Sequence, residues 1–151
     1  MNKEGTILVV DDNKGILTAL EMLLLGTFKK VISLNNPNHI LSTLETENVD
    51  VLLLDMNFSA GINTGNEGIF WLGEIRKYRK ELPVVLFTAY ADIELAVKAV
   101  KEGATDFVVK PWDNAKLVAT LLSAYHLNKS RTEVKHLKEK EKILKTQFNN
   151  N

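Results

Sequence analysis

The chain has 151 residues, and its 19 lysine and arginine residues balance its 19 aspartate and glutamate residues, so the formal net charge at pH 7 is zero. This balance excludes a broad electrostatic attraction to nucleic acid or to an acidic membrane, because any such contact must be local. The absence of cysteine excludes disulfides, thiolate metal sites and cysteine nucleophiles. A hydrophobic fraction of 45% is typical of a globular protein, and the length predicts one domain.

The amino terminus carries no pattern of an export signal. Residues 1–5 are polar, and the apolar run that follows is too short for a signal peptide or a membrane span. We expect no membrane contact. The lack of cysteine is compatible with a reducing compartment, and the expected location is the cytoplasm.

Short apolar runs rich in β-branched residues alternate with stretches whose apolar residues have helical spacing. The apolar runs predict strands at 7–10, 31–34, 49–54, 83–87 and 106–109. The stretches between and after them predict helices at 14–25, from Pro37 onward, at 68–79, at 92–101 and from about 113 to 148. Gly103 stops the fourth helix. Near-continuous hydrophobicity indicates strands buried on both faces. The alternation predicts right-handed βαβ units and an open, doubly wound α/β sheet.

The last helix contains no proline or glycine and is too long for a small domain. We expect its first part to dock on the sheet and residues 128–151 to leave the domain as a linker. A seven-residue repeat favours a short dimerising coiled coil, although Glu141 interrupts it; its apolar positions are Val134, Leu137, Leu144 and Phe148. The alternative is a solvated helix whose charges pair along its surface, as Glu141 and Lys145 can.

Polar side chains of several types follow four of the predicted strands. They are Asp11 and Asp12, then Asp55, then Thr88, then Lys110. Because the carboxyl ends of parallel strands meet at one edge of a sheet, we expect these side chains to converge. Crowded carboxylates repel each other unless a hard cation joins them, and oxygen-only ligands favour magnesium. The set predicts a carboxylate nucleophile for phosphoryl transfer, with a lysine and a hydroxyl to bind the phosphoryl oxygens.

The strand ends also carry four motifs in a fixed order. They are Val9-Val10-Asp11-Asp12, Leu52-Leu53-Leu54-Asp55, Phe87-Thr88-Ala89 and Asp106-Phe107-Val108-Val109-Lys110-Pro111. Together they make the chain resemble the receiver domains of two-component response regulators. The resemblance covers residues 5–127 and implies a flavodoxin-like, five-stranded parallel sheet in the order 2-1-3-4-5, flanked by five helices.

The resemblance also implies roles for the acidic residues. Asp55 would accept a phosphoryl group from a histidine kinase, and Mg²⁺ would be bound by Asp11, Asp12, Asp55 and the backbone carbonyl of Asn57. Of the adjacent pair, Asp12 is the expected direct ligand, whereas Asp11 can act through water.

The same resemblance implies a conformational switch. Lys110 and Thr88 would bind the phosphoryl group, and Phe107 would enter a pocket that Thr88 opens. The alternative for Phe107 is a buried core aromatic. Phosphorylation is expected to change the face made by the fourth helix, the fifth strand and the fifth helix, and dimerisation is expected to change with it. The expected homodimer forms through this face and the carboxyl-terminal helix.

The output of such a switch is suggested by the segment from Thr88-Ala89-Tyr90 to Lys110-Pro111-Trp112 and the long helix after it. These are similar to the amino-terminal part of sigma-54-dependent transcriptional regulators of the nitrogen-regulation type. In that family an AAA+ ATPase and a helix-turn-helix domain follow, and these residues contain no Gly-x-x-x-x-Gly-Lys phosphate loop. We expect a piece of a longer regulator without direct nucleic-acid contact; the alternative is a free-standing single-domain regulator.

Two functions of other classes compete with this interpretation. A magnesium-dependent phosphatase similar to the haloacid-dehalogenase superfamily would need a second carboxylate two residues after the nucleophile, where this chain has Asn57. A receiver used only as a docking module would not need magnesium or a phosphoryl group.

One stretch departs from the receiver family. Residues 56–68, between the acceptor and the third helix, are longer than in other members and contain Gly61, Gly65 and Gly68, which predicts a mobile segment. It is either a permissive surface insertion or a lid that tunes dephosphorylation or the choice of partner.

Overall fold

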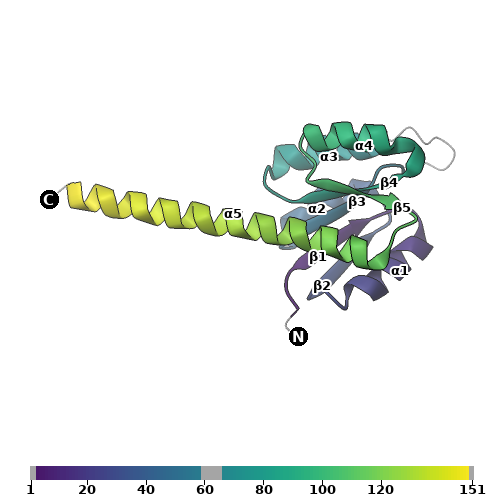
Figure 1. Cartoon of the computed structure of the whole chain (residues 1–151), viewed down its shortest axis with the longest axis horizontal. Helices are drawn as coiled ribbons and strands as arrows, with labels where there is room; N and C mark the ends of the chain where they lie inside the picture. The colour runs from purple at the N-terminus through teal and green to yellow at the C-terminus, as the bar shows by residue number, and fades with distance from the viewer. Residues whose placement is uncertain (1–2, 59–65, 150–151) are drawn as a thin grey trace.

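A five-stranded parallel sheet forms the centre of the domain in the computed structural model, which describes residues 3–58 and 66–149 (Figure 1). The strands are β1 (Thr6–Val10), β2 (Lys30–Leu34), β3 (Val51–Asp55), β4 (Val84–Ala89) and β5 (Asp106–Lys110). Their order is β2-β1-β3-β4-β5, and every neighbouring pair is parallel. The predicted strand order is therefore confirmed.

The helices cover both faces of the sheet. They are α1 (Lys14–Leu24), α2 (Ile40–Thr46), α3 (Asn66–Tyr78), α4 (Ile93–Lys101) and α5 (Asn114–Asn149), with single 3-10 turns at Pro37–His39 and Tyr90–Asp92. The helices α1 and α5 pack on one face, and α2, α3 and α4 pack on the other. This two-sided cover confirms the doubly wound α/β architecture with five helices.

The two covered faces explain the near-continuous apolar runs of the sequence. In β3, Leu52 and Leu54 join the core under α2, α3 and α4, whereas Val51 and Leu53 join the core under α1 and α5. Alternate residues of a strand point to opposite faces, so a strand covered on both sides needs apolar residues throughout.

Several predicted boundaries shift in the structure. Helix α3 begins at Asn66, so Gly68 lies in its first turn and not in the preceding loop. Residues 59–65 of the predicted long loop, with Gly61 and Gly65, lie outside the described residues. Gly103 follows α4 with φ of 134°, a conformation that favours glycine, and confirms the predicted stop.

Helix α5 docks with its first part and then leaves the domain (Figure 1). Leu117, Leu121 and Ala124 are buried against the sheet, whereas Val134 and Leu137 are 49% and 65% exposed. The side chain of Phe148 lies outside the described residues. Within the described chain, no helix is both long enough and apolar enough to span a membrane.

Candidate functional site

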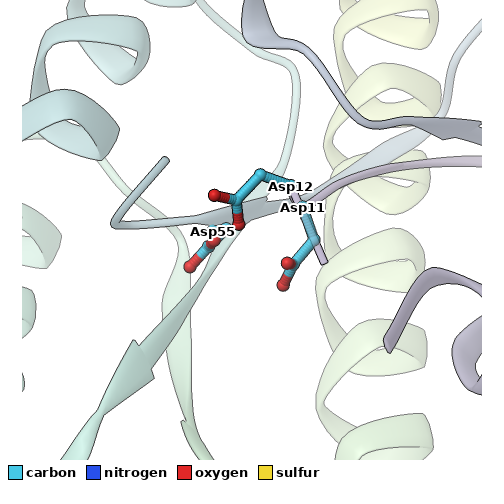
Figure 2. A group of neighbouring side chains, drawn as sticks. All are labelled: Asp11, Asp12 and Asp55. Atoms are coloured by element: carbon cyan, nitrogen blue, oxygen red, sulfur yellow. The ribbon is translucent and has the colours of Figure 1, made fainter. Parts of the chain in front are cut away.

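Three carboxylates meet at the carboxyl edge of the sheet. β1 and β3 are neighbours, so Asp11 and Asp12 after β1 come beside Asp55 at the end of β3 (Figure 2). One carboxylate oxygen from each residue lies within 4.8 Å of the others. Asp11 and Asp55 are buried, with 1% and 4% exposure, and Asp12 is exposed. The structure thus brings the three predicted acidic residues together.

Lys110 connects two of these carboxylates. Its Nζ donates to Asp11 Oδ2 at 2.8 Å and to Asp55 Oδ1 at 3.1 Å. It also lies 4.8 Å from the centre of the Phe87 ring. Buried carboxylates are costly unless they are paired and hydrogen-bonded, so Lys110 compensates the charges of Asp11 and Asp55.

The adjacent Asp11 and Asp12 differ in how their oxygens are used. Asp11 Oδ1 accepts a hydrogen bond from the Asn13 backbone N–H at 2.9 Å, and Asp11 Oδ2 accepts from Lys110. Within the described residues, no other residue donates a hydrogen bond to the Asp12 carboxylate, which is bonded only to the backbone N–H of Asp12 itself. Asp12 therefore has oxygens available for a direct ligand contact, whereas those of Asp11 are engaged.

The two oxygens of Asp55 are also unequal. Oδ1 accepts from Lys110 and from the Asn57 backbone N–H at 3.3 Å. No donor among the described residues reaches Oδ2. The side chain of Asn57 donates to Asp92 Oδ2 at 3.0 Å, which joins the loop after β3 to the start of α4. The pairing of Asn57 with Asp92 was not anticipated, because no local pattern links residues 35 positions apart.

Thr88 lies on β4, and Phe107 lies on the neighbouring strand β5. Thr88 is fully buried, and its hydroxyl donates to the Ala89 carbonyl at 3.2 Å, which is long for a hydroxyl donor. Within the described residues, no hydrogen bond joins Thr88 to Asp55 or Lys110. Phe107 is half-buried and packs against the core under α4.

The site is short of positive charge. Burial and the charge of Asp11, opposed by Lys110, raise the pKa of Asp55 to about 6. The limited burial of Asp12 and the charge of Asp11 raise the pKa of Asp12 above its ordinary value. Burial disfavours the charged form of Lys110, but its bonds to Asp11 and Asp55 outweigh this and raise the pKa of Lys110. A hard cation would stabilise all three carboxylates.

Comparison with known proteins gives the family. The profile described as response regulator receiver domain matches residues 7–122. The chain belongs to this family. Its fold, its strand-end residues and the sequence resemblance agree with that assignment.

This chain is similar to one solved receiver domain and to parts of longer proteins. It is 59% identical to the receiver domain of a Bacteroides fragilis response regulator, with 82% of this chain and 98% of that chain covered and a TM-score of 0.75. It is 34% identical to the DNA-binding transcriptional regulator NtrC of Salmonella typhimurium, over 78% of this chain and 24% of NtrC. It is 28% identical to NtrX of Brucella abortus, over 89% of this chain and 30% of NtrX, with a TM-score of 0.79. The chain spans about a quarter of the length of the curated relatives that it matches.

Gly68 is a residue of the receiver site whose role the sequence did not reveal. Its backbone N–H donates to the Met56 carbonyl at 3.0 Å. A Cβ on Gly68 would lie 2.5 Å from Met56 Cα and 3.0 Å from the Asp55 carbonyl oxygen. Glycine is therefore required because the first turn of α3 lies directly against the end of β3 and the start of the loop after it. The sequence suggested a different reason, mobility.

Asp55→Asn is expected to stabilise the metal-free receiver domain at pH 7.5. The pKa of Asp55 rises from 3.8 to about 6 on folding, so the folded state favours the protonated carboxyl. Protonation of Asp55 therefore stabilises the folded state; this contribution to the free energy of unfolding is complete below pH 3.8 and is lost as the pH rises through about 6. Asparagine removes the cost of the ionised carboxylate, roughly 3 kcal/mol at pH 7.5.

Urea unfolding in EDTA at pH 4.5 and pH 7.5 measures this effect. The increase in the free energy of unfolding caused by Asp55→Asn should be large at pH 7.5 and small at pH 4.5. The control Glu102→Gln removes an exposed carboxylate that forms no ion pair with any described residue, and it should change stability little at either pH. An equal gain at both pH values for Asp55→Asn would contradict the assignment.

Proposed function

We propose that this receiver domain accepts a phosphoryl group onto Asp55 from a phosphohistidine of a histidine kinase and thereby switches a transcription-regulating output. The observation that supports this proposal most directly is the difference in hydrogen bonding between the two oxygens of the Asp55 carboxylate. Oδ1 is held by Lys110 and by the Asn57 N–H, whereas Oδ2 accepts no hydrogen bond within the described residues. One oxygen is thus fixed and the other is available as a nucleophile.

The acidic residues fit Mg²⁺ as the cofactor of this transfer. Asp11, Asp12 and Asp55 supply only oxygen donors, which a hard divalent cation prefers. We propose that Asp12 and Asp55 bind the ion directly, that Asp11 acts through water, and that the Asn57 backbone carbonyl completes the set. When bound, Mg²⁺ supplies positive charge that neutralises the phosphoryl oxygens.

The remaining residues bind and orient the phosphoryl group. In the proposed step, Asp55 Oδ2 forms the new bond to phosphorus, and the phosphorus–nitrogen bond breaks with its electron pair left on the histidine. Lys110 is already beside Asp55 and supplies a positive charge for a phosphoryl oxygen. The Thr88 hydroxyl exchanges its long bond to Ala89 for a phosphoryl oxygen, and Phe107 moves into the space that Thr88 leaves.

Beryllofluoride, a phosphoryl mimic, tests the acceptor site. We expect magnesium-dependent binding, seen in NMR spectra as shifts around Asp55 and on the α4–β5–α5 face, and a mass increase of one phosphoryl group after incubation with acetyl phosphate. Asp55→Asn should abolish both, and the control Asp106→Asn, which replaces an exposed aspartate, should retain both. Binding that survives Asp55→Asn would contradict the proposal. Lack of any binding would favour a docking module.

The phosphatase alternative lacks a proton donor at the required place. The residue two positions after Asp55 is Asn57, and an amide cannot act as a general acid. The Asn57 side chain instead donates a hydrogen bond to Asp92 Oδ2. We therefore propose a signalling phosphoacceptor without turnover of phosphomonoesters.

The output part of the proposal rests on the relatives and on α5. The relatives are named as transcriptional regulators, and this chain covers a quarter of their length. We propose that residues 5–127 form the receiver and residues 128–151 a linker in a cytoplasmic, sigma-54-dependent regulator, with a free-standing regulator as the alternative. The exposed Tyr90 and Val97 near the α4–β5–α5 face, and exposed apolar residues along α5, support a homodimer. Light scattering with and without beryllofluoride measures the expected doubling of mass.

A further inference from the structure

A cleft lies at the opposite end of the sheet from Asp55, where α5 leaves the domain. It has a volume of about 450 Å³. Its walls are the end of α3 and the segment before β4, the turn between α4 and β5, and α5 from Ala124 to Lys135. Nothing in the proposed phosphoryl transfer uses this cleft. It is large enough for a small-molecule ligand.

The charged residues of the cleft are mostly basic. Arg76 comes from α3 and Lys80 from the turn that follows it, and Arg131 and Lys135 come from α5. Glu81 is the one acidic side chain among the residues that line the cleft, so four cations face one carboxylate. The whole chain has no net charge, so this is a local concentration of positive charge. Such a concave basic site attracts anions.

Arg76 adds a partly buried charge with no acidic partner. Its guanidinium donates to backbone carbonyls only, to Leu82 at 2.6 Å, to Gly103 at 2.9 Å and to Arg79 at 3.4 Å. No carboxylate of the described residues forms an ion pair with it. Burial lowers the pKa of Arg76. An anion in the cleft would compensate this charge.

The basic residues on α5 are free to turn toward a ligand. Arg131 is exposed and makes no ion pair within the described chain. Lys135 meets Glu81 at 3.7 Å, and both side chains are more than 60% exposed. An exposed pair of this kind contributes little, so an anion can displace Glu81.

The floor of the cleft is apolar. Leu82, Pro83, Ala104 and Ala124 are buried beneath it, and Leu127 lines it with 47% of its surface exposed. A ligand that fills the cleft must therefore combine an anionic group with an apolar or aromatic body. Free inorganic phosphate would leave the exposed part of Leu127 uncovered.

We propose that this cleft binds a phosphate-bearing small molecule of nucleotide size, with its phosphates between Lys80, Arg131 and Lys135 and its body on Leu127. Such a ligand touches both the receiver body and the outgoing part of α5. It would hold α5 in one direction relative to the sheet. The cleft is enclosed on several sides and offers no aromatic ring among its lining residues for stacking, which disfavours a nucleic-acid strand.

ATP in magnesium-free buffer with EDTA is the first probe, measured by calorimetry on the full 151-residue chain. We expect saturable binding, with NMR shifts confined to the cleft. Arg131→Glu should weaken binding at least tenfold, because it replaces an attractive charge by a repulsive one. Lys140→Glu makes the same charge change on an exposed part of α5 outside the cleft, and binding should be retained. Asp55→Asn should also bind as the wild type does, which separates this site from the acceptor.

Several outcomes would overturn the inference. These are no saturable binding to the wild type, an equal loss in Arg131→Glu and Lys140→Glu, or binding lost in Asp55→Asn. Inorganic phosphate or a polyglutamate peptide that binds as tightly as ATP would also overturn it, because the cleft would then recognise charge alone or an acidic protein segment.

Discussion

Gly68→Ala is expected to destabilise the domain by about 3 kcal/mol and to prevent the proposed phosphoryl acceptance at Asp55. The added Cβ would lie 2.5 Å from Met56 Cα and 3.1 Å from the Met56 carbonyl oxygen. Both are backbone atoms, so no side-chain rotation relieves the contact. Either α3 moves away from the sheet, or the loop that begins at Met56 moves and takes Asp55 out of position.

A matched control for this prediction lies five residues further along α3. Gly73 is in the same helix, and a Cβ there would meet nothing within 4 Å. Gly73→Ala should stabilise the domain by about 0.5 to 1 kcal/mol, because alanine has the higher helix propensity. Urea unfolding gives both values, and beryllofluoride binding reports on Asp55. A Gly68→Ala variant as stable and as active as wild type would show that α3 is not packed against the end of β3 and the start of the loop after it.

Lys110→Met is expected to destabilise the metal-free domain by about 3 kcal/mol at pH 7.5 and to abolish the proposed phosphoryl acceptance. Methionine keeps an unbranched side chain that is one atom shorter, and it removes the charge that compensates Asp11 and Asp55. Breaking a buried pair by removing one partner leaves the other charge uncompensated, and here two carboxylates are left. Partial exposure of Lys110 keeps the estimate at the low end of the usual range.

A double-mutant cycle separates this electrostatic effect from lost packing. In the Asp55→Asn background, one of the two carboxylates is already neutral, so Lys110→Met should cost less than in wild type. Urea unfolding of the four proteins in EDTA gives the coupling free energy. The exposed Lys116→Met serves as the control and should show none. An equal cost of Lys110→Met in both backgrounds would mean that Lys110 acts through packing.

The alternation of apolar runs and helical stretches was enough to predict the sheet, its covered faces and most element boundaries to within a residue or two. This worked because strands covered on both sides must be apolar throughout, and β3 is buried along its whole length. The acidic cluster was equally readable. Asp11, Asp12 and Asp55 each stand at a strand end, and parallel strands bring such ends to one edge.

The local sequence did not contain the contacts between distant segments. Asn57 meets Asp92, Gly68 packs on Met56, and Arg76 joins the start of β4 to the turn before β5. The prediction that Gly68 makes the loop mobile was wrong for this reason. The residue type alone does not distinguish a glycine needed for close packing from a glycine in a flexible loop.

The sequence alone therefore determined the α/β fold and which side chains gather at the carboxyl edge, because strand periodicity and chain order decide both. Only the tertiary structure decided which Asp55 oxygen is engaged, why position 68 must be glycine, and that a basic cleft lies where α5 leaves the sheet. These features depend on distances between segments far apart in the chain, and such distances are fixed only when the helices pack on the sheet.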